Sequence, residues 1–454
     1  MNWDNIDRFS LMYKILYYLV FLWLKIYYKR IVVRGLENIP KNVPVIFAPN
    51  HQNALMDAFA VLLPLNSKPV FLARADVFAG KMVTKFLKFA KIMPIYRIRD
   101  GIDTLQKNEE IFNQAIKVLE NKNKLVILPE GNHSGFRRLR ALKKGISRIA
   151  FQAEEKNNFK LGVNIIPVGL NYENYYKFRK TLFINYGKPF EVNQFAELYK
   201  ENDQKGHKAL LDELSNKLKP LMVNIENKDY YKVYDHLREI YKYQMRVNLG
   251  LKNTKQPNKL QCDQKLIATL DKQYDTDPKV FEWLQQKINA YNHNLKKFKF
   301  RDWLFNKTSY SFIKNFIRLL FLLITSPVFL YGLINNYLPF KLPDVISKKA
   351  VKDKQFLSTF NWGLGVVMFH LFYLLQFIAV WIIFKADWIK WAYLVSLPLT
   401  GLFAFWHFFQ TKKCIKKIKY NRLRIIKNKT FIETKNLRQE IIDKINKIYR
   451  QFNP

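Results

Sequence analysis

The chain has 454 residues, and its 76 Lys and Arg against 36 Asp and Glu give a formal net charge of +40. Hydrophobic residues make up 49% of the chain and gather in segments that only a bilayer or a very large core can hide, which argues against a nucleic-acid-binding protein. The two cysteines, Cys262 and Cys414, lie far apart, so a disulfide framework is excluded and a reducing cytosolic face is expected.

The first predicted element is an N-terminal membrane-anchor helix within residues 1–29. Residues 11–28 are apolar and aromatic but include Lys14 and Lys25, and this stretch has no small-residue cleavage site. These features favour an amphipathic helix at the membrane interface over a signal peptide.

Residues 30–192 form the second predicted element, an α/β domain with a mixed sheet flanked by helices. Short apolar runs alternate there with stretches of helical periodicity, which is typical of this fold class. The apolar runs span residues 43–48, 70–73, 125–128, 165–170 and 182–186.

A histidine and a carboxylate, His51 and Asp57, follow the first of these runs. A neutral imidazole can take a proton from an alcohol near pH 7, while the carboxylate fixes its tautomer and stabilises the imidazolium that forms. The alternative is a capping His and Asp at a helix N-terminus, which is common for such pairs. Because five residues intervene, the pair cannot share one face of a regular helix. We therefore expect His51 on the turn before the helix, or a π-bulge within it.

Arginines mark the end of a later apolar strand. Arg97 is the last residue of the segment 92–97 and is followed closely by Arg99. A guanidinium at this position can grip a phosphate bidentately. The alternative is a surface arginine that pairs with one of the two aspartates that follow.

Glu130 and Gly131 come directly after another apolar run. The glycine allows a tight turn and a close approach of substrate. Glu130 is expected to orient an acceptor hydroxyl or a neighbouring basic group, with a solvated turn carboxylate as the alternative. A cluster of basic residues comes next in the chain. It can bind the phosphates of an acyl thioester or an anionic lipid, and a solvated charged face is an equally good interpretation. The cluster consists of Arg137, Arg138, Arg140, Lys143 and Lys144.

Four blocks of the chain, in this order, resemble the glycerolipid acyltransferase superfamily. The blocks are Asn50-His51 with Asp57, the strand 92–97, the Pro-Glu-Gly segment 128–134 and the strand 165–172. The resemblance implies acyl transfer from a thioester of coenzyme A or acyl carrier protein to a glycerol-phosphate-type acceptor. His51 and Asp57 would be catalytic, with no metal or further cofactor. The residues that it assigns to substrate binding are Arg97, Arg99, Glu130, Gly131, Asn132, Lys143 and Lys144.

The chain departs from the commonest family pattern, which has four residues between the histidine and the aspartate. The longer spacing, together with the strand 167–172 and the Lys-Phe-Arg run 177–179, resembles fungal-type glycerol-3-phosphate or dihydroxyacetone-phosphate acyltransferases. That likeness implies the first acylation of phospholipid synthesis. A 1-acylglycerol-3-phosphate or lyso-aminolipid acyltransferase is the alternative, ahead of a membrane scaffold or transporter. Asn132-His133 stands where many relatives have Thr-Arg, which weakens a phosphate-binding role for His133.

The remainder of the chain is predicted to be helical. Residues 193–312 show helical spacing of leucines and form a region of unknown role, followed by a membrane region at 313–410 and a basic tail at 411–454. Within the membrane region, segments 362–384 and 391–409 are long and apolar enough to form a spanning hairpin.

A third apolar segment, 316–340, is interrupted by Ser326-Pro327 and by Asn335-Asn336. Basic runs flank it on both sides, so a full span would translocate one of them. The positive-inside rule therefore favours a re-entrant or kinked segment, although three spans stay open. We expect the catalytic domain on the cytoplasmic face of an integral membrane protein.

Overall fold

The computed structural model describes residues 3, 6–8, 10–65, 68–96 and 104–453. The chain forms two compact units. The first unit contains Met1–Asn224 together with the distant segment Asp353–Thr359, and the second contains Ile225–Lys352 and Phe360–Pro454.

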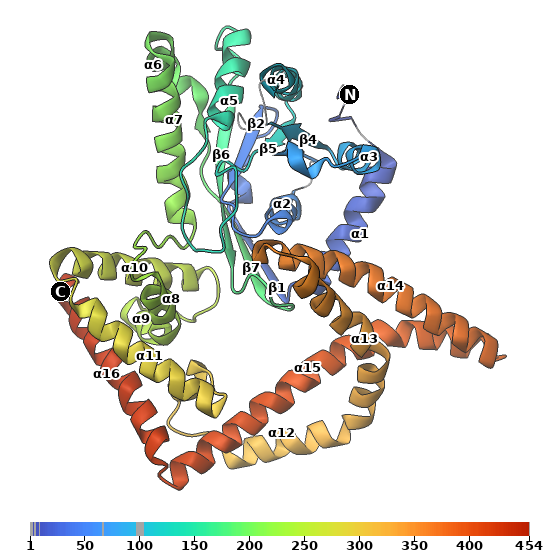
Figure 1. Ribbon diagram of the computed structural model, residues 1–454, viewed down its shortest axis with the longest axis vertical. Helices are drawn as coiled ribbons and strands as arrows, with labels where there is room; N and C mark the ends of the chain where they lie inside the picture. The colour runs from blue at the N-terminus through green and yellow to red at the C-terminus, as the bar shows by residue number, and fades with distance from the viewer. Residues whose placement is uncertain (1–2, 4–5, 9, 66–67, 97–103, 454) are drawn as a thin grey trace. The chain divides into compact units, whose positions relative to one another are not determined.

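Within the described ranges, the first unit is built around one eight-stranded mixed sheet (Figure 1). The strands are β1 (Arg30–Arg34), β2 (Val45–Pro49), β3 (Val70–Arg74), β4 (Ile92–Ile95), β5 (Lys124–Val126), β6 (Asn164–Tyr172), β7 (Thr181–Tyr186) and β8 (Phe190–Glu191). Their order is β1-β7-β6-β2-β5-β3-β4, and β8 pairs with β6. Strands β7 and β8 run antiparallel to β6, whereas the other pairs are parallel. The predicted α/β fold with a mixed sheet is confirmed.

Helices cover both faces of the sheet. They are α1 (Leu11–Tyr27), α2 (Leu55–Leu62), α3 (Lys81–Phe89), α4 (Thr104–Glu120), α5 (Gly145–Lys156), α6 (Ala196–Glu201) and α7 (Asp203–Leu218). Ile46 and Ala48 of β2 point to one face, in a core with Leu119 of α4, Phe151 of α5 and Leu214 of α7. Helix α2 packs against β6 and β7. Because β2 is buried on both faces, its sequence is a continuous apolar run rather than an alternating one.

Helix α1 is apolar on two sides. Ser10 caps its first turn by accepting a hydrogen bond from the backbone N–H of Tyr13 at 3.3 Å. One side is buried in the first unit through residues that include Tyr17 and Leu24. Six large hydrophobic side chains are exposed on the rest of the helix: Leu11, Met12, Ile15, Tyr18, Leu19 and Leu22. This exposure suits a helix that lies against a membrane surface.

The described residues of the second unit form helices and connecting loops, without a strand. Its helices are α8 (Tyr231–Ile240), α9 (Lys242–Asn248), α10 (Asn258–Thr276), α11 (Val280–Phe298), α12 (Phe312–Ile324), α13 (Ser326–Ala350), α14 (Leu357–Ile383, whose first turn belongs to the first unit), α15 (Asp387–Ile425) and α16 (Lys429–Phe452). Helix α16 packs against α10 and α11 through a buried stripe that includes Ile441 and Ile445. Within the predicted basic tail, Lys429–Phe452 therefore form a helix with its own core contacts.

Two helices of the described chain, α14 and α15, are long and apolar enough to cross a membrane. Helices α12 and α13 pass the same test together but meet at an angle of 58°, so the number of such segments rises to three if this pair is one span. The bend lies at Thr325, next to Ser326-Pro327, where the sequence predicts a break.

Asn335-Asn336, the second expected interruption, does not break α13. The Asn336 side-chain amide donates to the carbonyl oxygens of Gly332 at 2.9 Å and of Leu397 at 3.2 Å. The Tyr393 hydroxyl donates to Asn335 Oδ1 at 2.7 Å. Because partners on neighbouring turns and helices satisfy these amides, the polar pair is compatible with a continuous helix among apolar neighbours.

Candidate active site

The carboxyl ends of two neighbouring parallel strands bring the predicted catalytic segments together. His51 follows β2 by two residues, and Glu130 follows β5 by four. Because β2 and β5 pair in parallel, both segments leave the sheet at the same edge. Ligands of open α/β sheets bind at this kind of edge.

His51 and Asp57 are in direct contact. Nδ1 of His51 lies 2.9 Å from Oδ2 of Asp57, and the histidine side chain is 15% exposed while the aspartate is fully buried. Helix α2 begins at Leu55, so His51 lies before the helix and Asp57 in its first turn. Of the two arrangements expected from the sequence, the structure has the first, without a π-bulge.

A tight loop explains how the long spacing still gives a contact. The backbone N–H groups of Gln52 and Asn53 each donate to Asp57 Oδ2 at 2.7 Å, so the chain folds around the carboxylate. Ala54 then takes a φ of +45°, an unusual value for a residue other than glycine. The carboxylate thus holds the loop and the imidazole at once, and its two backbone donors keep it in place.

Tyr172 is a further residue of the candidate site, which the sequence marks only as the last position of the strand 165–172. Its hydroxyl, at the end of β6, donates to the other oxygen of Asp57, Oδ1, at 2.7 Å. The tyrosine is fully buried, and burial, with the nearby Asp57 carboxylate, raises its pKa well above the ordinary value. Tyr172 therefore stays a hydrogen-bond donor and completes the set of groups around Asp57.

Glu130 is buried and bridges two loops. Its Oε1 accepts from the backbone N–H of His51 at 2.7 Å, and its Oε2 accepts from that of Arg140 at 3.2 Å. Burial raises its pKa to about 8, although both backbone hydrogen bonds act in the opposite direction. Glu130 is placed to fix the loop that carries His51, and it is not a solvated turn carboxylate.

The raised pKa predicts how Glu130 couples stability to pH. The folded state keeps the proton up to about pH 8, whereas an ordinary glutamate loses it near 4.5. The contribution of Glu130 to the free energy of unfolding is therefore complete below pH 4.5 and is lost as the pH rises toward about 8. From about pH 5 to about pH 8.5, the wild-type melting temperature should fall relative to that of Glu130→Gln, which cannot ionise. Thermal melting in detergent measures this difference.

The matched control for this series is Glu197→Gln, because Glu197 is an exposed glutamate paired with Lys200. The difference between its melting temperature and that of the wild type should be the same at every pH. If the melting temperatures of Glu130→Gln and the wild type differ by the same amount at every pH, the assignment of a buried, protonated carboxyl is contradicted.

The turn after Glu130 needs its glycine. Gly131 has a φ of +65°, and a Cβ there would lie 3.1 Å from Cγ of Lys143. Asn132 is exposed, and its Oδ1 accepts from the backbone N–H of His133 at 3.0 Å. Lys143 is exposed beside this turn, whereas the Lys144 ammonium contacts Gln204 of α7. The turn therefore gathers Gly131, Asn132 and Lys143, and it leaves Lys144 directed to a neighbouring helix.

Arg97 and Arg99 lie outside the described residues. A different arginine reaches this edge of the sheet: Arg74, the last residue of β3, places Nη1 3.5 Å from Asn132 Oδ1. Its Nε also donates to Asp76 at 3.1 Å. The sequence pattern that marks Arg97 also marks Arg74, because Arg74 directly follows the apolar run 70–73.

His133 is held by a residue from far along the chain. Its Nε2 lies 3.0 Å from Oδ2 of Asp353, and its ring stands edge-on to that of His51 with 5.2 Å between centroids. Burial lowers the pKa of His133, against the opposing effect of the Asp353 carboxylate. A histidine with a depressed pKa is a poor fixed cation, which agrees with the weakened case for phosphate binding at this position.

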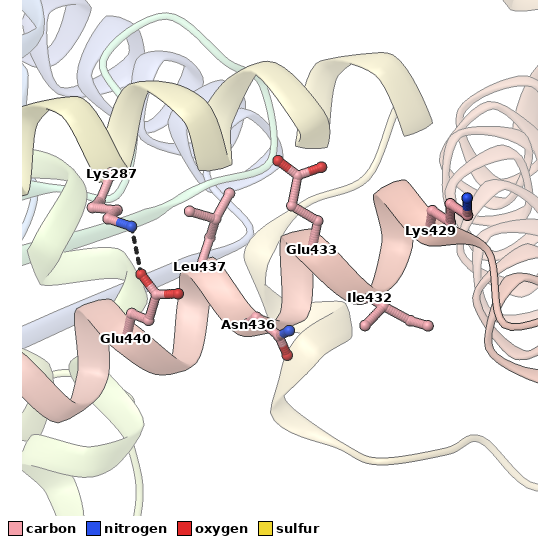
Figure 2. Close-up of a pocket in the computed structure, with 7 residues that line it drawn as sticks. All are labelled: Lys287, Lys429, Ile432, Glu433, Asn436, Leu437 and Glu440. Atoms are coloured by element: carbon pink, nitrogen blue, oxygen red, sulfur yellow. Dashed lines mark ion pairs between the residues drawn. The ribbon is translucent and has the colours of Figure 1, made fainter.

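A separate groove lies in the second unit, between α11 and α16 (Figure 2). Lys287 on one side pairs with Glu440 on the other at 2.6 Å. Its lining residues are Lys287, Lys429, Ile432, Glu433, Asn436, Leu437 and Glu440. The groove holds none of the residues that surround His51, and its charged rim resembles an ordinary helix interface.

Comparison with known proteins covers the part of the chain that contains this site. Residues 30–171 match the family model described as Acyltransferase. Glycerol-3-phosphate O-acyltransferases 1 and 2 of Saccharomyces cerevisiae are both 26% identical to the chain, over 208 and 196 residues. These matches cover 45% and 43% of this chain, and 26% and 25% of the yeast proteins. The chain thus spans about a quarter of the length of these relatives.

A solved structure is also similar to part of the chain. It is the crystal structure of the 1-acyl-sn-glycerophosphate acyltransferase of Thermotoga maritima, at 18% sequence identity and a TM-score of 0.33. The match covers 46% of this chain and 80% of that protein.

Proposed function

We propose that this chain, whose residues 30–171 form an acyltransferase domain of the glycerolipid acyltransferase superfamily, transfers a fatty acyl group to a glycerol phosphate. The observation that carries the proposal is the contact between His51 and the buried Asp57 at the edge of the sheet. Asp57 occupies one ring nitrogen and leaves the other, Nε2, to exchange a proton with a substrate hydroxyl.

The proposed reaction proceeds in two steps. His51 Nε2 takes the proton of the acceptor hydroxyl as its oxygen forms a bond to the thioester carbonyl carbon. The tetrahedral intermediate then collapses, the carbon–sulfur bond breaks, and the departing sulfur takes that proton from the imidazolium. Asp57 stabilises the imidazolium between the steps. No protein nucleophile is needed, because the acceptor hydroxyl attacks directly.

The proposed acceptor is glycerol-3-phosphate or dihydroxyacetone phosphate, and the donor is an acyl thioester of coenzyme A or acyl carrier protein. The names of the two yeast relatives support this acceptor, as does the spacing of His51 and Asp57. Arg97 and Arg99 are proposed to bind the phosphate. Arg74 and Lys143, which lie beside the turn of Gly131 and Asn132, are proposed as further cations. Asn132 is proposed to position the acceptor with them.

We also propose that the first unit works on the cytoplasmic side of a membrane. The apolar exposed residues of α1 and the apolar helices α14 and α15 support association with a bilayer. Free, buried Cys262 and Cys414 and the strongly basic composition are compatible with the cytosolic side.

A competition assay tests the choice of acceptor. The purified full-length chain receives a labelled acyl thioester with equal concentrations of glycerol-3-phosphate and lysophosphatidate. We expect labelled lysophosphatidate as the main early product, because a site that binds a small soluble acceptor has no preference for an existing acyl chain. Thin-layer separation of the lipids identifies the product.

The matched control is the same assay with His51→Ala, which reveals any contaminating acyltransferase. Phosphatidate formed mainly from the added lysophosphatidate would overturn the proposed acceptor and favour the 1-acylglycerol-3-phosphate acyltransferase alternative. It would leave the roles of His51 and Asp57 intact.

A further inference from the structure

The segment Asp353–Thr359 joins the first unit although residues 225–352 separate it from the rest of that unit in the chain. It contains the short 3-10 helix Lys354–Phe356 and the first turn of α14. The acyltransferase family match ends at residue 171 and does not reach it. Its contacts nevertheless converge on the surroundings of His51.

The first line of contact runs through His133. Asp353 Oδ2 lies 3.0 Å from His133 Nε2, and the Phe356 ring packs edge-on against the same imidazole with 4.8 Å between centroids. His133 is 5% exposed in its side chain, and its ring meets that of His51 at 82°. Asp353 and Phe356 therefore fix a ring that itself borders the catalytic histidine.

The second line of contact runs through Asn53. The Ser358 hydroxyl donates to Asn53 Oδ1 at 2.5 Å, and both residues are completely buried. The backbone N–H of Asn53 donates in turn to Asp57 Oδ2. Ser358 is thus two hydrogen bonds away from the carboxylate that orients His51.

We propose that Asp353 and Ser358 are positioning residues for acyl transfer, acting on the His51–Asp57 pair through His133 and Asn53. This inference rests on the proposed function. It gives the C-terminal half of the chain a part in the chemistry beyond anchoring. A carboxylate that holds an imidazole by one nitrogen fixes both its ring orientation and its tautomer, and a misplacement near the base is costly in turnover.

Asp353→Asn is the sharpest variant, because Asp353 has two tasks. Its Oδ1 accepts from the backbone N–H of Gln355 at 3.1 Å and so caps the short 3-10 helix. An asparagine oxygen can keep that cap, while its amide nitrogen meets His133 Nε2 as a donor. The substitution therefore preserves the turn and reverses the hydrogen bond to the imidazole.

The experiment measures kcat and KM of full-length variants with glycerol-3-phosphate and an acyl-coenzyme A. Asp353→Asn should lower kcat about 10-fold, and Ser358→Ala about 3- to 10-fold, with both KM values within about threefold of the wild type. The matched control, Asp344→Asn, removes an aspartate of α13 that pairs with Lys341 and Lys348 and should leave kcat unchanged.

A double variant tests whether Asp353 acts through His133. If it does, Asp353→Asn should have little further effect on kcat in a His133→Ala background. A full 10-fold loss in that background, or wild-type kcat in both Asp353→Asn and Ser358→Ala, would overturn the proposal. A fall in kcat matched by an equal loss of folded protein would also overturn it, because the residues would then be structural only.

A second measurement does not depend on turnover. Diethyl pyrocarbonate labels accessible histidines, and mass spectrometry can follow His133 directly. Labelling of His133 should be slow in the wild type and at least several-fold faster in Asp353→Asn, with His236 as an exposed internal standard. Unchanged protection would overturn the contact. A wild type that does not acylate glycerol-3-phosphate yet shows this labelling pattern would instead overturn the proposed function.

Discussion

The His51→Ala variant should lose ~10²- to 10⁴-fold in kcat, because proton transfer by a positioned base contributes that much to such reactions. The fold should survive the change. Asp57 keeps three other donors, the backbone N–H groups of Gln52 and Asn53 and the Tyr172 hydroxyl, so no buried charge is left unpaired. Initial rates at saturating substrates and a melting temperature in detergent measure the two effects separately.

The control for this prediction is His236→Ala. His236 lies on α8, where its Nδ1 contacts the carbonyl oxygen of Lys232 one turn earlier. Its removal should leave kcat unchanged. Near-normal turnover in His51→Ala would show that another group removes the hydroxyl proton.

Asp57→Ala should damage both activity and folding. Removing the carboxylate leaves the donors of Gln52, Asn53 and Tyr172 without their acceptor in a buried loop. Each unpaired buried donor costs about 1–3 kcal/mol, so the loss approaches the whole stability of a typical domain. We expect a large drop in melting temperature and kcat below the limit of detection.

Asp57→Asn should be much milder, and the contrast between the two variants is the test. An asparagine oxygen can take the place of Oδ2 and accept from the two backbone N–H groups and from His51. Its amide nitrogen can then face the Tyr172 hydroxyl, which turns to accept instead of donate. Only the charge that stabilises the imidazolium is lost. An Asp57→Ala protein as stable as Asp57→Asn would mean that the carboxylate does not hold the loop.

The part of the site that the sequence predicts well is the part that is local in the chain. His51 and Asp57 meet across one loop, so their spacing limits the pair to two arrangements, a histidine on the turn before the helix or a π-bulge, and the structure has the first. The buried strands are equally visible, because a strand covered on both faces must be continuously apolar. For Glu130 the sequence predicts a site residue but not its partners. A carboxylate next to a glycine does not reveal that backbone N–H groups donate to both of its oxygens.

The contacts that the sequence does not reveal join residues far apart in the chain. Tyr172 reaches Asp57 across 115 positions, and Asp353 reaches His133 across 220. Tyr172 ends the strand 165–172, which marks it as part of a block but gives it no role, and Asp353 lies in no motif. A tyrosine that ends a strand and an aspartate before a helix have many ordinary uses. The sequence also did not predict that α13 continues through Asn335-Asn336. The partners of those amides include residues on α14 and α15, which are distant in the chain.

The discontinuity of the first unit also sets an order of events during synthesis. The strands and helices up to Asn224 leave the ribosome first, and they can collapse around their own core. The contact of His133 with Asp353 must wait until the residues between them have been made. Closing so long a loop adds little entropic cost, because that cost grows only with the logarithm of loop length. The surroundings of His51 are therefore completed only as α14 emerges from the ribosome. The candidate active site would then form at the same stage as the helices that are apolar enough to enter the bilayer.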